Sequence, residues 1–530
     1  MATFRGELPR SPDRAAATAA PCAGRGLVRA PSRRVVLAAL IAIVALGGAL
    51  RAVQATDPGR YLSSDERSYA RIALSLAAGD GYQAPGSTDP WHWAPGTPAV
   101  FAAAHLIAPG ADGDGSPAQL NSAFWAQALV GTALILVVFL LAAGLAGPLA
   151  GLVAAGAVAT YPPLIRATGD LVSEPLGALT LALAALALLT AWKRPQPWRL
   201  VLAGAALGVA LLVRADLLVL PAVLGAVWFL LARGRAGTRT ALGQATLLVA
   251  VPLLVAAPWS TYASMQSGRF IPVAGSGPST LFVGTYLPGD GKLGGVRQQL
   301  QLYVRRNMPN LTNVRTNNLR GEYVLRAYIR ERHPELVPGP YRAIPEDKLR
   351  WALGFEARRN LKTYAVHRPA AFAAMEARKV TRMWGGYYRG GTRNPRSWLT
   401  AWHLLLVGLA LAGSVAGLAL ARGRRAGLIL VLTPVVTSTA VNAVFVAQAR
   451  HNLRVLPLLV AVGAAGGVLA IQALRERRGT PWLPIEADPP GDQITVERGA
   501  ITVPGDVTSP AEPRYRAGRV RARARSASRR

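Results

Sequence analysis

Residues 126–145 read AQALVGTALILVVFLLAAGL, a run of twenty residues that contains no charged side chain. Roughly 20 apolar residues in helical conformation are enough to cross the hydrocarbon core of a bilayer. The apolar residues here are continuous, whereas a helix on the surface of a soluble protein would carry them on one face only. The run therefore indicates a membrane-spanning helix.

Nine further apolar blocks share this pattern and predict an all-α polytopic membrane protein with about ten transmembrane helices. The composition agrees, because 51% of the 530 residues are hydrophobic and only 16% are charged. For the first block, a signal peptide or a twin-arginine export signal at Ser32-Arg33-Arg34 is the alternative, but the many later blocks favour a first span. The ten blocks are 35–50, 118–145, 148–166, 174–192, 199–213, 217–232, 240–258, 400–421, 427–447 and 453–474.

The chain is strongly basic, with 59 Lys and Arg against 27 Asp and Glu and a formal charge of +32. In a soluble protein this charge would suggest nucleic acid, but here it follows the membrane topology, and we expect no nucleic-acid partner. Basic residues mark the short connections 193–194, 233–235 and 422–425 and the tail after Arg475. By the positive-inside rule we predict a plasma-membrane protein with both termini cytoplasmic. The single cysteine, Cys22, excludes an internal disulfide.

The blocks and the stretches between them divide the chain into five predicted parts. Residues 345–367 and 369–384 carry apolar residues at helical spacing and predict amphipathic helices within a long insertion. The five parts are a disordered cytoplasmic tail (1–34), a membrane core (35–258) whose first outer loop is 54–117, an extracytoplasmic insertion (259–399), C-terminal transmembrane helices (400–475) and a disordered basic cytoplasmic tail (476–530).

The first outer loop is rich in acidic and aromatic residues. It reads SSDERSYA at 63–70, GDGY at 79–82 and WHWAPGTP at 91–98. Residues 66–78 predict a helix that begins after a capping serine or aspartate. The acidic pair Asp65-Glu66 is a candidate carboxylate site at the membrane surface. Alternatively, the aspartate only caps the helix and the glutamate is a solvated residue of its first turn.

In this order, the motifs of the loop resemble the first extracytoplasmic loop of the GT-C membrane glycosyltransferases. The acidic pair is followed by a tyrosine three residues on, then by Gly-x-Gly-Tyr and Pro-Gly-x-Pro, as in the protein O-mannosyltransferases and the lipid A aminoarabinose transferases. Later stretches resemble the family in the same order, although Ala215 stands where proline is usual and 260–262 where Arg-Asn is common. These later stretches are 161–175, 208–221, 258–273 and 450–457.

The resemblance implies an inverting transfer of a sugar from a polyprenyl-phosphate donor to an extracytoplasmic hydroxyl acceptor, which is a lipid, a glycan or a protein, in contact with membrane lipids. Such a reaction needs a carboxylate to take the acceptor proton and cations to hold the leaving phosphate. The resemblance implies Asp65 as catalytic base with Glu66 and Glu174 as further catalytic candidates, Arg214, Arg450 and Arg454 as ligands of the donor phosphate, and Tyr69, Tyr82 and His92 as substrate-binding residues.

Most of these candidates have a structural alternative. Glu174 could be only the first-turn acid of its span, which the helix dipole favours. Arg214 could simply pair with Asp216 across a turn between two helices. Arg450 and Arg454 could extend toward lipid headgroups at the membrane surface.

Two histidines are relevant to a metal cofactor, and several other function classes are alternatives. His92 and His451 are candidate ligands of a divalent metal ion, but no metal-binding spacing supports them. A transporter or lipid flippase would place ionisable residues in mid-span, and a noncatalytic scaffold would not need the acidic loop. An O-antigen-type ligase or polymerase uses the same donors, but usually lacks an early Asp-Glu loop.

Overall fold

The described part of the chain is built from helices joined by turns, and these ranges contain no strand, which confirms the all-α prediction. All of it belongs to the first of two units in the chain, residues 1–485. The tails predicted to be disordered, 1–34 and 476–530, lie almost entirely outside the described residues, as does Cys22. The structure is a computed structural model that describes residues 32–56, 62, 64–84, 89–110, 117–307, 322–336, 344–389 and 396–478.

Each predicted apolar block forms a helix, so the protein is a multi-pass membrane protein. In the described ranges, eight helical stretches are long and apolar enough to cross a membrane, and two helices that meet at a 60° bend make a ninth. The helix α8 (Pro197–Val213) is apolar but has only 17 residues. The spans are α1 (Arg33–Ala55), α4 (Asn121–Ala146), the bent pair α5 (Pro148–Thr160) and α6 (Pro162–Thr168), α7 (Glu174–Lys193), α9 (Leu220–Ala236) after η3 (Ala215–Leu217), α10 (Thr238–Ser267), α16 (Ser397–Leu420), α17 (Arg425–Val444) after η10 (Arg422–Arg424), and α18 (Leu456–Arg477).

Two of these helices extend furthest beyond the blocks that predicted them. The first block ends at residue 50, but α1 continues to Ala55 and buries Arg51 completely. The helix α10 continues past residue 258 to Ser267, although two prolines lie within it. Because Arg51 lies inside a span, its charged side chain must find polar partners within the bundle.

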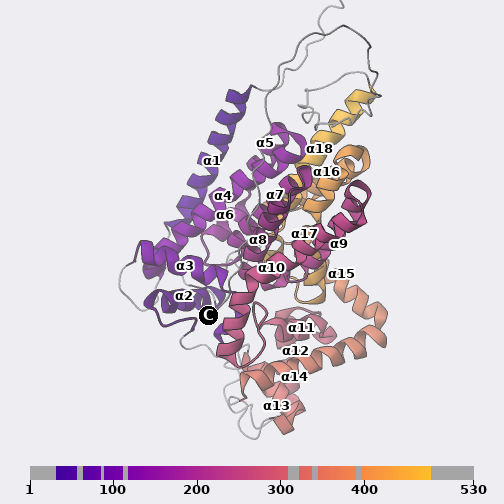
Figure 1. Ribbon diagram of the computed structural model, residues 1–530. Coiled ribbons are helices and arrows are strands. Elements are labelled where there is room, and N and C mark those ends of the chain that lie inside the picture. The colour runs from indigo at the N-terminus through magenta and orange to yellow at the C-terminus, as the bar shows by residue number, and fades with distance from the viewer. Residues whose placement is uncertain are drawn as a thin grey trace, which may run out of the picture. The chain divides into compact units, whose positions relative to one another are not determined.

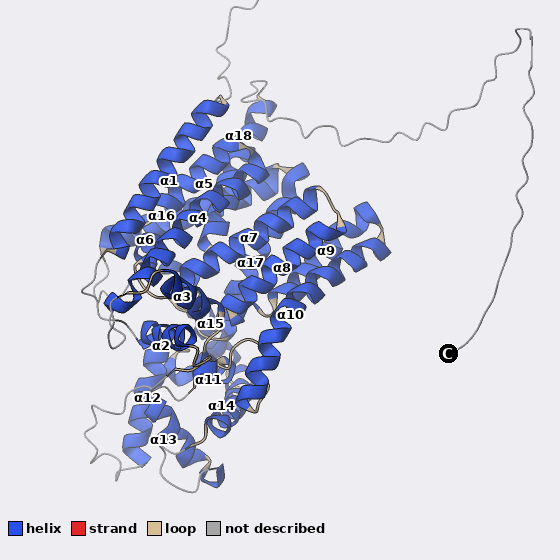
Figure 2. Ribbon diagram, turned by 60° about the vertical axis from the view of Figure 1, so that its left-hand side comes forward, coloured by secondary structure: helices blue, strands red, loops and turns tan. Residues whose placement is uncertain are grey.

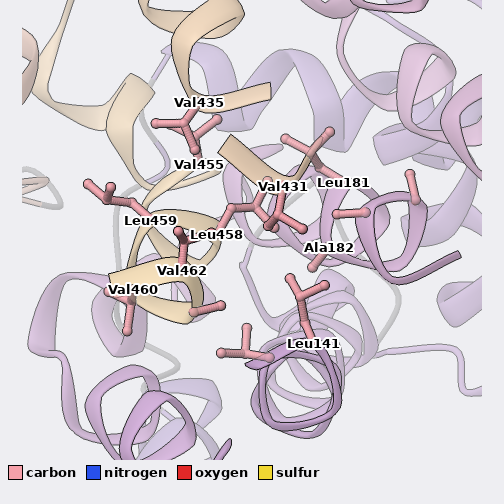
Figure 3. Packing of buried hydrophobic residues seen from close by; sticks show 14 of the residues in the cluster. Leu141, Leu181, Ala182, Val431, Val435, Val455, Leu458, Leu459, Val460 and Val462 are labelled. Atoms are coloured by element: carbon pink, nitrogen blue, oxygen red, sulfur yellow. The ribbon is translucent and has the colours of Figure 1, made fainter. Parts of the chain in front are cut away.

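The bundle is held together by aliphatic and small side chains. Leu141 of α4 and Leu181 of α7 lie close to Val431 of α17 in one continuous core (Figure 3). Lipid tails are as apolar as these side chains, so helices in a membrane associate mainly through close packing. Between α16 and α18 the packing reaches the backbone, because a methyl group added at Gly413 would collide with the carbonyl of Gly463.

A second set of helices lies at one end of the bundle (Figures 1 and 2). The helices α11 to α14 lie at the end away from the start of α1 and the end of α18, and α2 lies toward that same end. The elements of the first loop are α2 (Ser64–Ala78), η1 (Pro90–His92), α3 (Gly96–Ile107) and η2 (Pro117–Leu120). Those between α10 and α16, called the insertion below, are α11 (Gly277–Thr285), η4 (Leu287–Gly289), α12 (Leu293–Asn307), α13 (Glu322–Arg332), η7 (Pro334–Leu336), α14 (Glu346–Asn360), η9 (Leu361–Val366) and α15 (Pro369–Gly385), and η11 (Ala449–Asn452) joins α17 to α18.

The two helices predicted within the insertion are confirmed. The stretch 345–367 forms α14 and the short π-helical turn η9, and 369–384 forms α15. Leu349 and Leu353 of α14 are buried in a core that α11, α12 and α13 share. The helix α15 is attached differently, because its buried Lys379 donates a hydrogen bond of 2.9 Å to a carbonyl at the end of α11.

Candidate active site

The acidic pair of the first loop lies in the first turn of α2. The helix begins at Ser64, so Asp65 and Glu66 stand at its N-terminus, where the helix dipole favours negative charge. Glu66 is buried, and its Oε1 accepts a hydrogen bond of 2.9 Å from the backbone N–H of Leu171. Asp65 Oδ2 accepts one of 2.6 Å from Arg450 Nη1. The alternative in which Glu66 is a solvated residue is therefore wrong.

Glu174 lies between two guanidinium groups at the start of α7. Only 2% of the residue is exposed, and its Oε1 lies 3.6 Å from Arg214 Nη1 and 3.7 Å from Arg450 Nε. Glu174 is thus a first-turn acid, as its structural alternative states, and in addition a partner of both arginines. Since Arg450 also contacts Asp65, the acids of two loops far apart in the sequence meet at one arginine.

Arg214 and Arg454 share the carboxylate of Asp216. Arg214 follows the last residue of α8, and it donates hydrogen bonds of 2.8 Å to Ser173 Oγ and 3.1 Å to Asp216 Oδ1. The pair with Asp216 that was the alternative for Arg214 is therefore present. Arg454 is fully buried, contacts Asp216 Oδ2, and donates a hydrogen bond of 3.1 Å to Ser438 Oγ. A fully buried side chain does not reach lipid headgroups, so that alternative is wrong for Arg454.

The surroundings fix the charge of the basic residues. Burial lowers the pKa of Arg450, but Glu174 and Asp65 together outweigh it and raise the pKa above its usual value. Burial lowers the pKa of Arg454 to about 10, so this side chain is still charged at neutral pH. Burial, and then the neighbouring Arg454, holds the pKa of His451 well below its usual range, so its imidazole is neutral. The ionic cluster consists of Asp65, Glu66, Glu174, Arg214, Asp216, Arg450 and Arg454.

Sequence reasoning missed a second group beside this cluster. Asp170 lies in the turn between α6 and α7, accepts a hydrogen bond of 2.7 Å from the hydroxyl of Tyr388, and lies 3.8 Å from Arg166 Nη2. Burial, and then Asp170, raises the pKa of Tyr388, which keeps the hydroxyl protonated. Asp170 lies within the stretch 161–175 and could have been found there. Tyr388 could not, because 218 residues separate it from Asp170 and no motif surrounds it.

The three predicted substrate-binding residues occupy different places. Tyr69 is buried beside the ionic cluster with its ring 5.0 Å from that of Trp93, and burial raises its pKa to about 12. Tyr82 belongs to an aromatic group, with its ring 4.7 Å from that of Trp259 and its hydroxyl donating to the carbonyl of Trp93. His92 packs edge-on against Trp93 and lines a cavity. Of the three, Tyr69 is therefore the one that lies beside the ionic cluster.

The cavity has a volume of about 310 Å³ and lies between the first loop and the insertion. Ser68, Asp89 and His92 line it from the first loop, and the insertion contributes aliphatic side chains such as Leu300 together with the charged residues Arg297, Glu346 and Arg350. Ser68 comes three residues after Asp65 on α2, so the two side chains lie on the same face of the helix. The cavity therefore adjoins the ionic cluster.

The described residues contain no group of three or more His, Cys, Asp or Glu side chains that could hold a metal ion. Of the two histidines considered from the sequence, His92 lines the cavity and His451 lies in η11.

A family profile and several solved structures are similar to this chain. The sequence profile of the dolichyl-phosphate-mannose-protein mannosyltransferase family matches residues 116–262, which run from η2 into α10. The Archaeoglobus fulgidus oligosaccharyltransferase in the apo form aligns with 84% of this chain at 16% identity and a TM-score of 0.50; the alignment covers 51% of that protein, so this chain spans about half its length. ArnT from Cupriavidus metallidurans bound to undecaprenyl phosphate aligns with 83% of this chain and 78% of its own, at 15% identity and a TM-score of 0.38. No curated protein matches the sequence.

The family profile matches part of the membrane core, and the oligosaccharyltransferase shares the helical fold of this chain. The matched stretch includes Asp170, Glu174 and Arg214 of the site, but Asp65 and Arg450 lie outside it. The argument for the roles of these last two residues therefore rests on where the structure places them.

Proposed function

We propose that this protein transfers a sugar from a polyprenyl-phosphate donor to a hydroxyl group of an extracytoplasmic acceptor, with inversion at the anomeric carbon. The observation that carries the proposal is the contact of 2.6 Å between Asp65 Oδ2 and Arg450 Nη1. It places a carboxylate that can accept a proton beside a cation that can hold a phosphate. The family whose profile matches the core is named for a lipid-phosphate-linked sugar, which agrees with such a donor.

Arg214 and Arg450 are the proposed ligands of the donor phosphate. Their side chains are 17% and 31% exposed, so a bound phosphate can reach them without unfolding the site. Guanidinium groups bind phosphate with two parallel hydrogen bonds. Arg454 was also predicted as a phosphate ligand, but it is fully buried against Asp216. We therefore assign it the positioning of Asp216, which in turn holds Arg214.

The reaction is a single displacement at the anomeric carbon. The acceptor oxygen attacks this carbon while the bond to the phosphate oxygen breaks, and the electron pair of that bond leaves with the polyprenyl phosphate. The acceptor proton passes to the carboxylate of Asp65, and Arg450 then exchanges part of its contact with Asp65 for the leaving phosphate. Attack opposite to the leaving group inverts the configuration, as expected for one step without a covalent enzyme intermediate.

The cavity between the first loop and the insertion is the proposed entrance for the acceptor. It is lined by Ser68, on the helix face that also carries Asp65, so an acceptor hydroxyl bound there lies near the base. Pockets for small ligands are usually about 300–1,000 Å³, and the cavity of about 310 Å³ fits one small group of an acceptor.

The site is proposed to face the outside of the plasma membrane, with both termini cytoplasmic. Short connections rich in basic residues support this orientation. Reporter fusions within residues 344–389 should therefore report an extracytoplasmic location. A cytoplasmic result would place the insertion and the donor-dependent site in the wrong compartment and reject the orientation.

The function is tested by mass spectrometry of lipid extracts and envelope glycans from cells with the protein, without it, and with Asp65→Asn. The proposal expects one sugar-bearing product to disappear in the deletion and in Asp65→Asn, while its polyprenyl-phosphate-linked precursor accumulates. Unchanged products, or a precursor found only on the cytoplasmic side, would instead favour a lipid flippase or another transporter.

A further inference from the structure

The bend between α5 and α6 leaves two backbone carbonyl groups without their normal helical donors. In an α-helix, each carbonyl accepts a hydrogen bond from the N–H four residues later. The residues four places after Val158 and Ala159 are Pro162 and Pro163, and proline has no N–H to donate. The two helices meet there at 60°, within a segment that is otherwise apolar enough to cross the membrane.

The guanidinium group of Arg51 replaces both missing donors. Arg51 Nη2 donates to the carbonyl of Val158 at 3.0 Å, and Nη1 donates to the carbonyl of Ala159 at 3.1 Å. Nη1 also donates at 2.9 Å to the carbonyl of Gly47, one turn earlier in α1. Unpaired carbonyls cost several kcal/mol in a bilayer where no water reaches them, so this match of donors to the two orphaned acceptors stabilises the bend.

The neighbouring helix α4 leaves room for this arrangement. A methyl group added at Gly131 would collide with Cγ2 of Thr168 in α6 and would lie 2.8 Å from Nε of Arg51, so the glycine leaves room for both side chains. Arg51 is fully buried, and among the described residues no carboxylate forms an ion pair with it. Burying a charge within a membrane costs free energy. Here the hydrogen bonds to the two carbonyls at the bend offset that cost.

The bend determines where the second acidic segment of the site begins. After α6 the chain turns at Asp170, the N–H of Leu171 donates to Glu66, and Ser173 accepts from Arg214. A straight helix through residues 148–168 would carry this segment away from α2. The direction of α6 therefore decides whether residues 170–174 can meet the first loop.

We infer that Arg51 is a positioning residue, which holds the bend between α5 and α6 by supplying the donors that Pro162 and Pro163 lack, and so delivers residues 170–174 to the active site. The part of this inference that concerns the site rests on the proposed function. The part that concerns the bend does not.

The experiment compares purified variants by thermal unfolding in detergent and by affinity for undecaprenyl phosphate alone. Arg51→Met is expected to lower the unfolding temperature by several degrees and to weaken binding about tenfold or more, the size of one lost charge-assisted contact. Arg51→Lys keeps donors for the carbonyls, so its unfolding temperature and its affinity should lie between those of wild type and those of Arg51→Met. Arg34→Met, in the exposed start of α1, is the matched control.

The decisive variant combines Arg51→Met with Pro162→Ala and Pro163→Ala. The N–H groups of its two alanines can donate to the carbonyls of Val158 and Ala159, so the unfolding temperature should recover. Because the helix is then straight, the affinity for undecaprenyl phosphate should stay at least about tenfold below that of wild type. Recovery of both quantities would show that Arg51 only satisfies carbonyls, and recovery of neither would overturn the account of the bend. If the wild-type protein does not bind undecaprenyl phosphate, the proposed donor is wrong, and recovery of the unfolding temperature alone then decides for or against Arg51 as the replacement donor.

Discussion

Two groups of charged residues lie around the cavity, and both combine acids with arginines. In the ionic cluster, Arg450 contacts two different acids at 2.6 and 3.7 Å and remains 31% exposed. In the second group, called the clamp, the shared residue is more enclosed than Arg450: Asp89 is 7% exposed and is paired with both Arg269 and Arg350. The clamp consists of Asp89, Arg269, Arg326, Glu346 and Arg350 and connects the first loop to the turn after α10 and to α13 and α14.

The difference in exposure between Arg450 and Asp89 indicates that the two groups have different roles. Pairs that are buried and fully engaged hold elements together, and breaking one leaves an uncompensated charge. Pairs that keep exposed area and share partners can exchange them for a ligand. We therefore expect changes in the ionic cluster to affect transfer more than folding, and changes in the clamp to affect folding more than transfer.

The largest expected effect is on transfer in Asp65→Asn. An amide cannot accept the proton of the acceptor, and general-base assistance typically contributes about 10² to 10⁴-fold to the rate. The unfolding temperature should change little, because the pair with Arg450 is partly exposed and such pairs stabilise a protein by about 1 kcal/mol or less. Transfer by the purified variant, measured beside its thermal unfolding, checks both statements.

Glu66→Gln is the matched control for that experiment. Its side-chain carbonyl can still accept the hydrogen bond from Leu171 N–H, so folding and transfer should both be nearly normal. If Asp65→Asn turns over normally, Asp65 is not the base and Glu66 or Glu174 takes its place as the candidate. If Glu66→Gln loses transfer instead, the roles of the two acids are exchanged.

The clamp gives the next largest effect, and it falls on stability. Asp89→Asn leaves the cations of Arg269 and Arg350 without their shared carboxylate. Removing one partner of a buried ion pair costs about 3–5 kcal/mol. The thermal unfolding temperature should drop clearly, whereas the affinity for undecaprenyl phosphate should stay within about twofold of wild type. A loss of phosphate binding without a loss of stability would abolish the distinction between the two groups.

Arg450→Ala should weaken binding of undecaprenyl phosphate by roughly 10- to 150-fold, since a hydrogen bond to a charged group contributes about 1.5–3 kcal/mol. The direction of its pKa shift, above the usual value, means that the guanidinium stays charged, so the loss should not vary between about pH 8 and 9, where the phosphate monoester is fully ionised as well. Arg450→Lys should recover part of the affinity but not the paired geometry. Isothermal titration with all three proteins decides this, and equal affinities would return Arg450 to a structural role.

Much of the fold follows from the sequence, because continuous apolar runs and helical spacing are local signals. The spans and both predicted helices of the insertion were found in this way. Among the site residues, Asp65, Glu174 and Arg214 follow from short motifs that lie next to helix ends. What the sequence cannot provide is pairing across long separations: Asp65 meets Arg450 across 385 residues, and Tyr388 meets Asp170 across 218. The sequence places Arg51 at the flank of a span, and its pairing with the carbonyls that Pro162 and Pro163 leave without donors is visible only once α1 lies beside α5.

The smallest expected effect concerns Tyr388, which follows α15 and connects the end of the insertion to Asp170 in the turn before α7. Tyr388→Phe removes one hydrogen bond of 2.7 Å to Asp170, while the acid keeps Arg166 nearby. A hydrogen bond of this kind contributes about 1 kcal/mol, so transfer should fall by less than about tenfold, with folding almost unchanged. Because burial raises the pKa of Tyr388, its hydroxyl is protonated throughout the range in which the protein is stable, and the effect should be the same at pH 6 and pH 9. Rates measured at both pH values test this. A much larger loss would make Asp170 a participant in the reaction, and an effect that grows with pH would mean that Tyr388 itself loses its proton.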